Sequence, residues 1–221
     1  MALLLVAPDR DLDLLAKEIR SRSAGMDVRV WPHMGEVEDI QFAVLWQQPP
    51  GLLGQLRQLK AVSSLGAGAE HLLADPDLPP ALPVGRLAGR RLAADMAGYL
   101  VAQALGHWRG LDQFSRQQAQ RQWVPRTPAN PPRIGVMGTG RMAQATLKAF
   151  KALEVPVRAF NRSGEPRSDI SVQSGQDGLY SLAAWSDYLI CLLPLTAETR
   201  GILNAALFKH MQSAGVLINV G

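Results

Sequence analysis

The residues best suited to chemistry in this sequence lie in the run Gly138-Thr139-Gly140-Arg141-Met142-Ala143, which matches the pattern G-x-G-x-x-A. The run follows a predicted strand and opens a predicted helix at about 141–153. Gly138 permits a tight turn, Gly140 lets the backbone approach a pyrophosphate, and Ala143 lets the helix pack closely on the strand. The N–H groups at the start of the helix attract an anion. The context therefore favours a dinucleotide site over an ordinary strand-to-helix turn.

The end of the next predicted strand, at 155–160, indicates which dinucleotide is bound. An NAD site usually has Asp or Glu at this place, which binds the ribose 2′-hydroxyl. This sequence has Asn161, Arg162 and Ser163 instead, and the next carboxylate is Glu165. A carboxylate would repel a 2′-phosphate, whereas an arginine can pair with one. We therefore expect NADP(H) in preference to NAD(H), the alternative being that Arg162 is a solvated loop residue.

Strands that alternate with helices must position these residues. Apolar runs and helical spacing of apolar residues predict the alternation along most of the chain. Strands are predicted at 3–8, 27–31, 42–46, 61–65, 134–138, 155–160, 169–172, 188–194 and 215–220, and helices at 11–22, 52–59 and 141–153. This order predicts an α/β fold with parallel sheets covered on both faces.

A proline-rich segment divides the chain. Residues 123–132, WVPRTPANPP, contain four prolines, which block helix continuation and favour extended chain. Before it, residues 93–121 contain no proline and predict one or two long helices. We therefore expect a first domain at 1–122 that includes this linking helix, a linker at 123–132, and a second domain at 133–221.

The amino-acid composition indicates which binding partners and which cellular compartment to expect. The net charge of +4 is spread along 221 residues without a dense basic block, so we expect no nucleic-acid partner. No run approaches the ~20 apolar residues of a membrane span, and the N-terminus lacks the basic region of a signal peptide. The single cysteine, Cys191, lies in an apolar run and is expected to be buried and inert. These features predict a cytoplasmic protein, and we expect no metal site.

Longer stretches of the chain resemble one enzyme family. The stretch FAVLWQQPP followed by LKAVSSLGAGAEHLL is similar to the substrate-domain strand, loop and glycine turn of the D-isomer-specific 2-hydroxyacid dehydrogenases. HWRGLDQFSRQQAQRQW resembles the family's helix leading into the cofactor domain. LLPLTAETRGILNAALFKHMQSAGVLINVG resembles its strand-loop-helix-strand on the far side of the cofactor. These blocks run from about residue 42 to the C-terminus and look most like the glyoxylate/hydroxypyruvate reductase A branch.

The resemblance implies a fold and an activity. The fold would be an N-terminal flavodoxin-like substrate domain followed by a doubly wound Rossmann dinucleotide-binding domain, which at 221 residues would be incomplete. The activity would be NADPH-dependent reduction of a small 2-keto acid, such as glyoxylate or hydroxypyruvate, to the 2-hydroxy acid. A homodimer formed largely through the cofactor domain would also be expected.

The resemblance also assigns roles to individual positions. In the turn Gly66-Ala67-Gly68, the N–H groups of Ala67 and Gly68 would hold the substrate carboxylate, and Trp46 would line the substrate pocket. The remaining positions would bind the cofactor. They comprise Gly138, Thr139, Gly140, Arg141 and Met142 at the pyrophosphate, Asn161, Arg162 and Ser163 at the adenosine ribose, Leu193, Pro194 and Thr199 at the adenine and nicotinamide-ribose side, and Asn219 and the residues after it near the nicotinamide.

The family's catalytic Arg, Glu and His have no counterpart in these 221 residues. The Arg belongs to an N-x-x-R-G motif, of which INVG, ending at Gly221, matches the part before the Arg. We therefore expect a C-terminally truncated chain with little turnover, which is either a fragment of a longer enzyme, the alternative we favour, or a truncated gene product. None of the four histidines matches the family's position, and His71 is the one worth testing. The alternatives are a non-catalytic dinucleotide-binding module, an inactive remnant, or a corepressor built on the same fold.

Overall fold

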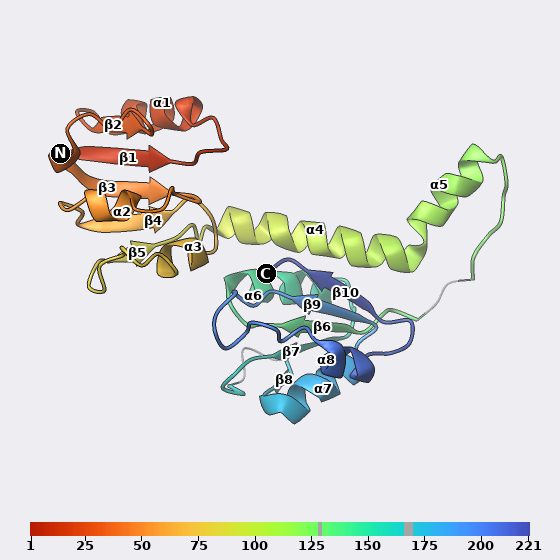
Figure 1. The fold of residues 1–221 in the computed structure, drawn as a ribbon. Coiled ribbons are helices and arrows are strands. Elements are labelled where there is room, and N and C mark those ends of the chain that lie inside the picture. Colours follow the sequence, from red (N-terminus) through yellow and green to blue (C-terminus); the bar gives the residue numbers. More distant parts are fainter. Residues whose placement is uncertain (128–129, 166–169) are drawn as a thin grey trace. The chain divides into compact units, whose positions relative to one another are not determined.

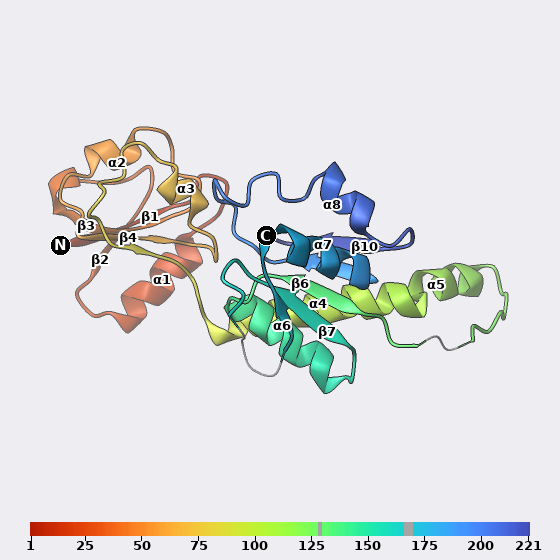
Figure 2. The same cartoon turned by 90° about the horizontal axis from the view of Figure 1, so that it is seen from below.

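The computed structural model describes residues 1–127, 130–165 and 170–221. Two compact units divide the chain, Met1–Ala88 and Gly89–Gly221. Each unit contains a five-stranded sheet of parallel strands with helices packed against it (Figure 1; Figure 2). The predicted α/β class with parallel sheets is confirmed. No helix in the described parts of the chain is long and apolar enough to cross a membrane.

The first unit has the strand order β2-β1-β3-β4-β5. This is the flavodoxin-like order, so the prediction for the N-terminal part is confirmed. The strands are β1 (Ala2–Val6), β2 (Asp27–Val30), β3 (Ile40–Leu45), β4 (Ala61–Ser64) and β5 (Val84–Gly85). The helices are α1 (Asp13–Arg22), the 3-10 turn η1 (Val37–Asp39), α2 (Leu52–Gln55) and α3 (Glu70–Leu73).

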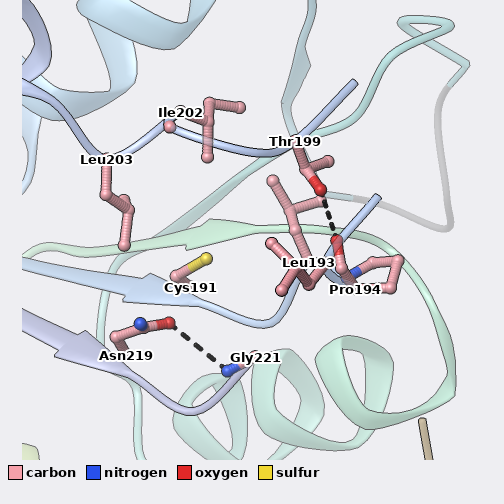
Figure 3. Close-up of a pocket in the computed structure, with 10 residues that line it drawn as sticks. Cys191, Leu193, Pro194, Thr199, Ile202, Leu203, Asn219 and Gly221 are labelled. Atoms are coloured by element: carbon pink, nitrogen blue, oxygen red, sulfur yellow. Dashed lines mark hydrogen bonds between the residues drawn. The ribbon is translucent and has the colours of Figure 1, made fainter. Parts of the chain in front are cut away.

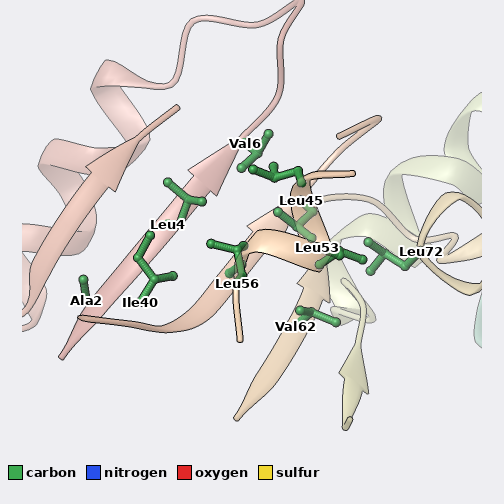
Figure 4. Close-up of a cluster of buried hydrophobic side chains, with 11 residues drawn as sticks. Ala2, Leu4, Val6, Ile40, Leu45, Leu53, Leu56, Val62 and Leu72 are labelled. Carbon is green, nitrogen blue, oxygen red and sulfur yellow. The ribbon is translucent and has the colours of Figure 1, made fainter. Parts of the chain in front are cut away.

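Side chains of the first sheet are buried on both faces because successive residues of a strand point to opposite sides. Leu4 and Val6 pack with leucines of α2 and α3 on one face, which Figure 4 shows. Leu5, between them, packs with Ala16 of α1 on the other. The continuous apolar run at the N-terminus is thus explained by a strand covered twice.

The second unit has the strand order β10-β9-β6-β7-β8. Counted from its own first strand, β6, this is the order 3-2-1-4-5 of a doubly wound Rossmann sheet, as predicted. The strands are β6 (Ile134–Met137), β7 (Val157–Phe160), β8 (Val172–Gln173), β9 (Tyr188–Cys191) and β10 (Val216–Asn219). The helices are α4 (Arg90–Arg109), α5 (Leu111–Ala119), α6 (Arg141–Ala152), α7 (Gly175–Trp185) and α8 (Ala205–His210).

The long helix α4 belongs to the second unit by packing. Its residues Leu100 and Ala104 are fully buried in one cluster with Ile134 of β6 and Phe150 of α6. The compact units therefore divide after Ala88, earlier in the chain than the expected boundary at 122. The sequence reveals the apolar face of α4, but it does not reveal which sheet covers that face.

Several element boundaries differ from expectation. The helix expected over 52–59 ends at Gln55, because Leu56 leaves helical geometry with φ −92° and ψ 63°. The one or two helices expected over 93–121 are two, α4 and α5, separated by Gly110 in the left-handed region at φ +70°. The strand expected at 169–172 begins on Asp169, which lies outside the described residues, and β8 occupies Val172–Gln173.

Candidate cofactor and substrate sites

The turn between β6 and α6 has a backbone that requires glycine at its first position. Gly138 has φ +115°, a conformation that side chains rarely adopt. Its N–H donates a 2.8 Å hydrogen bond to the carbonyl oxygen of Phe160 at the end of β7. A methyl group at Gly138 would lie 3.3 Å from the carbonyl oxygen of Leu192. Gly138 therefore closes the turn between the ends of two neighbouring strands.

Gly140 leaves open space at the start of α6. It is the N-terminal cap of the helix, and a Cβ placed on it would meet no atom within 4 Å. The following residues Arg141 and Met142 form the first turn of the helix, whose initial N–H groups have no acceptor inside the helix. Ala143 is buried against the sheet. An anion can thus approach the backbone here, which is what a pyrophosphate site requires.

Asn161, directly after β7, organises the neighbouring loop. Its Nδ2 donates to the Thr139 hydroxyl oxygen at 3.2 Å and to the Glu165 carbonyl oxygen at 3.0 Å. Its Oδ1 accepts a 2.6 Å hydrogen bond from the N–H of Gly164. The Asn161 amide is therefore engaged in positioning the loop, a role that the sequence analysis did not foresee.

Arg162 and Ser163 lie at the outer edge of this loop. The Ser163 hydroxyl stays local and donates to the Asn161 Oδ1 at 3.4 Å. The Arg162 guanidinium forms an ion pair with the carboxylate of Glu198, which lies in the loop after β9. Glu198 was missed from the sequence because nothing in the spacing of these residues brings them together.

A pocket of about 180 Å³ opens at the carboxyl ends of β9 and β10 (Figure 3). It brings together Leu193, Pro194, Thr199 and Asn219, all expected at the cofactor. The Thr199 hydroxyl donates a 2.5 Å hydrogen bond to the Pro194 carbonyl oxygen, which fixes the shape of this loop. Gly221, one of the residues after Asn219 that were expected near the nicotinamide, also lines the pocket. The other lining residues were not predicted: Cys191, Leu195, Gly201, Ile202 and Leu203.

Cys191 contributes a largely buried thiol to this pocket. Burial raises the pKa of the Cys191 thiol above its usual value. A thiol with a raised pKa stays protonated near neutral pH and is a poor nucleophile. The predicted burial of Cys191 is confirmed.

The glycine turn of the first unit packs against Trp46. A Cβ on Gly66 would lie only 2.2 Å from the Trp46 ring, so no larger residue fits there without a shift. The Gly66 N–H donates to the Ser64 hydroxyl at 3.0 Å. The Arg10 side chain lies over the Trp46 ring, with its guanidinium carbon 4.6 Å from the centre of the ring. Trp46 is thus half-buried between a glycine turn and an arginine.

The next two residues of the turn remain candidates for binding a carboxylate. The Ala67 carbonyl oxygen accepts a 2.8 Å hydrogen bond from Arg86, which holds the turn. The Glu70 carboxylate lies beside Gly68, at 2.1 Å from the place where a Cβ of Gly68 would be. The side chain of Glu70 therefore occupies the space beside Gly68, and a carboxylate held by this turn would take its place.

Three of the four histidines contact aromatic side chains. The His71 ring contacts the Trp46 ring edge-on at 5.1 Å, and its Nε2 lies 3.2 Å from the Leu45 carbonyl oxygen. Because a carbonyl oxygen only accepts, Nε2 carries the proton in this contact. His107 Nδ1 lies 2.7 Å from the Tyr188 hydroxyl oxygen, and His210 stacks on the ring of Tyr180.

Within the described residues, no cluster of His, Cys, Asp and Glu could hold a metal ion.

Comparison with known proteins identifies the family. Residues 101–221 match the family model described as the NAD binding domain of D-isomer specific 2-hydroxyacid dehydrogenases. The chain belongs to this family. Its resemblance to the family, inferred above from sequence blocks, is confirmed, and it is an oxidoreductase of the 2-hydroxyacid dehydrogenase type.

Curated relatives extend the match into the first unit. A glyoxylate/hydroxypyruvate reductase A of Citrobacter koseri is 31% identical over 216 residues, which cover 95% of this chain and 67% of the relative. The enzyme of the same name from Yersinia enterocolitica is 29% identical over 209 residues, which cover 91% of this chain and 66% of the relative. The chain thus spans about two thirds of the length of these relatives.

Solved structures share the fold of almost the whole chain. A D-isomer specific 2-hydroxyacid dehydrogenase from Xanthobacter autotrophicus, in complex with NADPH and MES, superposes with a TM-score of 0.91 at 29% identity. It is covered over 71% of its length, against 99% of this chain. An NADPH-dependent glyoxylate/hydroxypyruvate reductase from Sinorhizobium meliloti, in complex with NADP and sulfate, gives a TM-score of 0.88 at 28% identity, with 100% of this chain and 73% of the other covered.

Proposed function

We propose that the protein binds NADP(H) in preference to NAD(H) and uses it to reduce a small 2-keto acid, such as glyoxylate or hydroxypyruvate, to the 2-hydroxy acid. One observation carries the proposal. The open start of α6 at Gly140 lies beside the loop after β7. This loop begins with an amide, Asn161, where an NAD site has a carboxylate, and it presents Arg162.

The residues present fit the parts of the cofactor. Gly140 and the first turn of α6 offer open backbone donors to the pyrophosphate. Arg162 offers a guanidinium to the 2′-phosphate. The pocket lined by Leu193, Pro194 and Asn219 suits the nicotinamide side. When bound, the cofactor supplies the hydride, while these residues hold and orient it.

The substrate would lie on the glycine turn of the first unit. There the backbone N–H groups of Ala67 and Gly68 would hold its carboxylate, and Trp46 would form a wall. Exposed backbone donors at glycine-containing turns suit small anions. The relatives' names, glyoxylate/hydroxypyruvate reductase A, support a 2-keto acid of two or three carbons.

We further propose a homodimer that forms through the second unit. The helix α5 and residues 120–127 extend away from the sheet of this unit (Figure 1). They expose apolar side chains next to a hollow of about 710 Å³. The exposed residues are Leu111, Phe114, Trp123 and Val124. Apolar surface of this kind marks protein–protein contacts.

The 221-residue chain is expected to bind the cofactor but to reduce glyoxylate slowly. The general acid that would protonate the forming alkoxide, a His in this family by resemblance, has no match among its four histidines. Loss of general acid catalysis alone slows a reaction by about 10²- to 10⁴-fold. Consumption of NADPH with glyoxylate, followed at 340 nm, measures this, and rapid turnover would contradict the expectation.

The binding proposal is tested at Gly140. Its φ of −70° suits any residue and its Cβ would point into open space, so Gly140→Val should leave the fold intact. The added methyl groups would occupy the place proposed for the pyrophosphate, so NADPH affinity should fall by more than about tenfold, or about 1.4 kcal/mol. The control is Gly98→Ala in α4, whose Cβ also meets nothing within 4 Å. If Gly140→Val titrates with NADPH like the control, the cofactor does not bind at this turn.

A further inference from the structure

An ion pair joins the two loops that flank the glycine turn. Arg162 follows β7 and Glu198 follows β9, and in the sheet these strands lie on either side of β6. The carboxyl end of β6 leads into Gly138 and Gly140. The Arg162–Glu198 pair therefore connects the neighbours of the strand whose end would hold the cofactor. The arginine expected to receive a 2′-phosphate already has a carboxylate as its partner.

Both partners project from turns with internal hydrogen bonds. On the Glu198 side, the N–H of Thr196 donates to the Thr199 hydroxyl at 2.8 Å, and the N–H of Arg200 donates to the Thr196 carbonyl at 2.9 Å. On the Arg162 side, the Asn161 side chain binds the backbone of its own loop and Thr139. These hydrogen bonds thus hold the turns from which Glu198 and Arg162 project.

The pair is weak enough to be exchanged. The Arg162 and Glu198 side chains are 83% and 67% exposed. Ion pairs this exposed are screened by water and salt and contribute little to stability. A phosphate monoester carries close to two negative charges and three acceptor oxygens, so it is the stronger partner for a guanidinium.

We propose that Glu198 competes with the cofactor's 2′-phosphate for Arg162 and is therefore a specificity-determining residue that limits the preference for NADPH over NADH. This rests on the proposed NADP(H) site. NADPH must separate Arg162 from Glu198 and leaves that carboxylate near a phosphate of like charge. NADH has no 2′-phosphate and leaves the pair intact.

Removal of the Glu198 charge should therefore change the affinity for ligands that carry a 2′-phosphate and leave the affinity for other ligands unchanged. Glu198→Gln keeps the size of the side chain but removes the competing carboxylate. The affinity for 2′,5′-ADP, a probe that carries the 2′-phosphate, should rise by about two- to fivefold, the range expected for an exposed ion pair. The affinity for 5′-AMP, which lacks the 2′-phosphate, should stay the same. Isothermal titration calorimetry of the 221-residue chain gives both dissociation constants.

Two further variants separate competition from other effects. Glu154→Gln makes the same change of net charge just after the C-terminal end of α6, the helix whose start carries the glycine turn, and should leave both affinities unchanged. In a chain that already carries Arg162→Ala, Glu198→Gln should give no gain in affinity, because the guanidinium for which the carboxylate and the 2′-phosphate compete is absent. A gain that persists in Arg162→Ala would overturn the inference.

The remaining outcomes are distinct. If the wild-type chain binds 2′,5′-ADP no better than 5′-AMP, the proposed NADP(H) preference fails, and the competition fails with it. If the wild-type chain prefers 2′,5′-ADP but Glu198→Gln matches Glu154→Gln, only the competition is overturned. If Glu198→Gln weakens 5′-AMP, Glu198 binds the ribose hydroxyls instead, and the inference is again wrong.

Discussion

The side-chain amide of Asn161 donates a 3.2 Å hydrogen bond to the hydroxyl oxygen of Thr139, and it thereby joins the loop after β7 to the glycine turn after β6. The same amide nitrogen holds the Glu165 carbonyl oxygen at 3.0 Å. A carboxylate cannot donate either hydrogen bond. The residue at the end of β7 therefore sets both the shape of the loop and the charge that a ribose would meet.

Asn161→Asp is expected to move the cofactor preference toward NADH. The new carboxylate would repel a 2′-phosphate and could accept a hydrogen bond from a ribose 2′-hydroxyl. The ratio of NADPH to NADH affinity should fall by about tenfold, a change of about 1.4 kcal/mol. Titration of each cofactor, with Asn161→Ala to report the loss of the amide alone, measures the ratio. An unchanged ratio in Asn161→Asp would show that this position does not face the ribose.

Arg133 directly precedes β6 and Asp187 directly precedes β9, and their contact joins the amino ends of these two strands. From this contact we predict that the stability of the chain depends on pH. The Asp187 carboxylate accepts hydrogen bonds from the Arg133 backbone N–H at 2.8 Å and from its side chain at 2.9 Å and 3.1 Å. The Arg133 side chain lowers the pKa of Asp187 in the folded chain. A lowered folded pKa gives stability that is present above the unfolded pKa, about 3.9, and is lost as the pH falls through the folded value.

Asp187→Asn should therefore destabilise the chain at pH 7 by about 1 kcal/mol, a small effect because both side chains are about two-fifths exposed. The difference in melting temperature from wild type should be constant down to about pH 5 and should shrink below about pH 4. Thermal melts followed by circular dichroism across this range measure it. A difference that does not change with pH would show that the carboxylate charge contributes nothing.

Trp123 provides a test of the proposed dimer. It is 93% exposed, more than any other large apolar side chain in the described residues, and it lies beside Val124 in the segment after α5. Trp123→Ser should shift the chain from dimer to monomer in light scattering coupled to size-exclusion chromatography. The control is Leu153→Ser, another exposed apolar residue, at the end of α6. A monomeric wild-type chain, or a dimer in both variants, would rule out this segment as the interface.

Periodicity and glycine spacing predicted most of the fold, because they are local properties of the chain. The alternation of apolar strands and amphipathic helices led to both parallel sheets. The glycine pattern located the turn whose φ of +115° at Gly138 no other residue readily adopts. The domain boundary was harder to predict, because the partner of α4 is chosen by packing of Leu100 and Ala104 against a sheet that is formed much later in the chain.

Motifs in the sequence indicate backbone features of the candidate site more readily than side-chain contacts between its loops. The residues of the glycine turn and of the pocket at Leu193 follow from motif position. The ion pair between Arg162 and Glu198 joins residues from separate loops, and no spacing rule relates them. Its one signal in the sequence is that Glu198 is the only carboxylate between β9 and α8.

The most direct test of the central claim is the pair of dissociation constants for NADPH and NADH in the wild-type chain and in Arg162→Ala, with Arg162→Lys as an intermediate. The account predicts that wild type binds NADPH more tightly than NADH. Arg162→Ala should lose most of that preference, and Arg162→Lys should keep part of it, because lysine retains the charge but not the two parallel hydrogen bonds. Equal affinities for the two cofactors in wild type, or an undiminished preference in Arg162→Ala, would contradict the assignment of Arg162 to the 2′-phosphate.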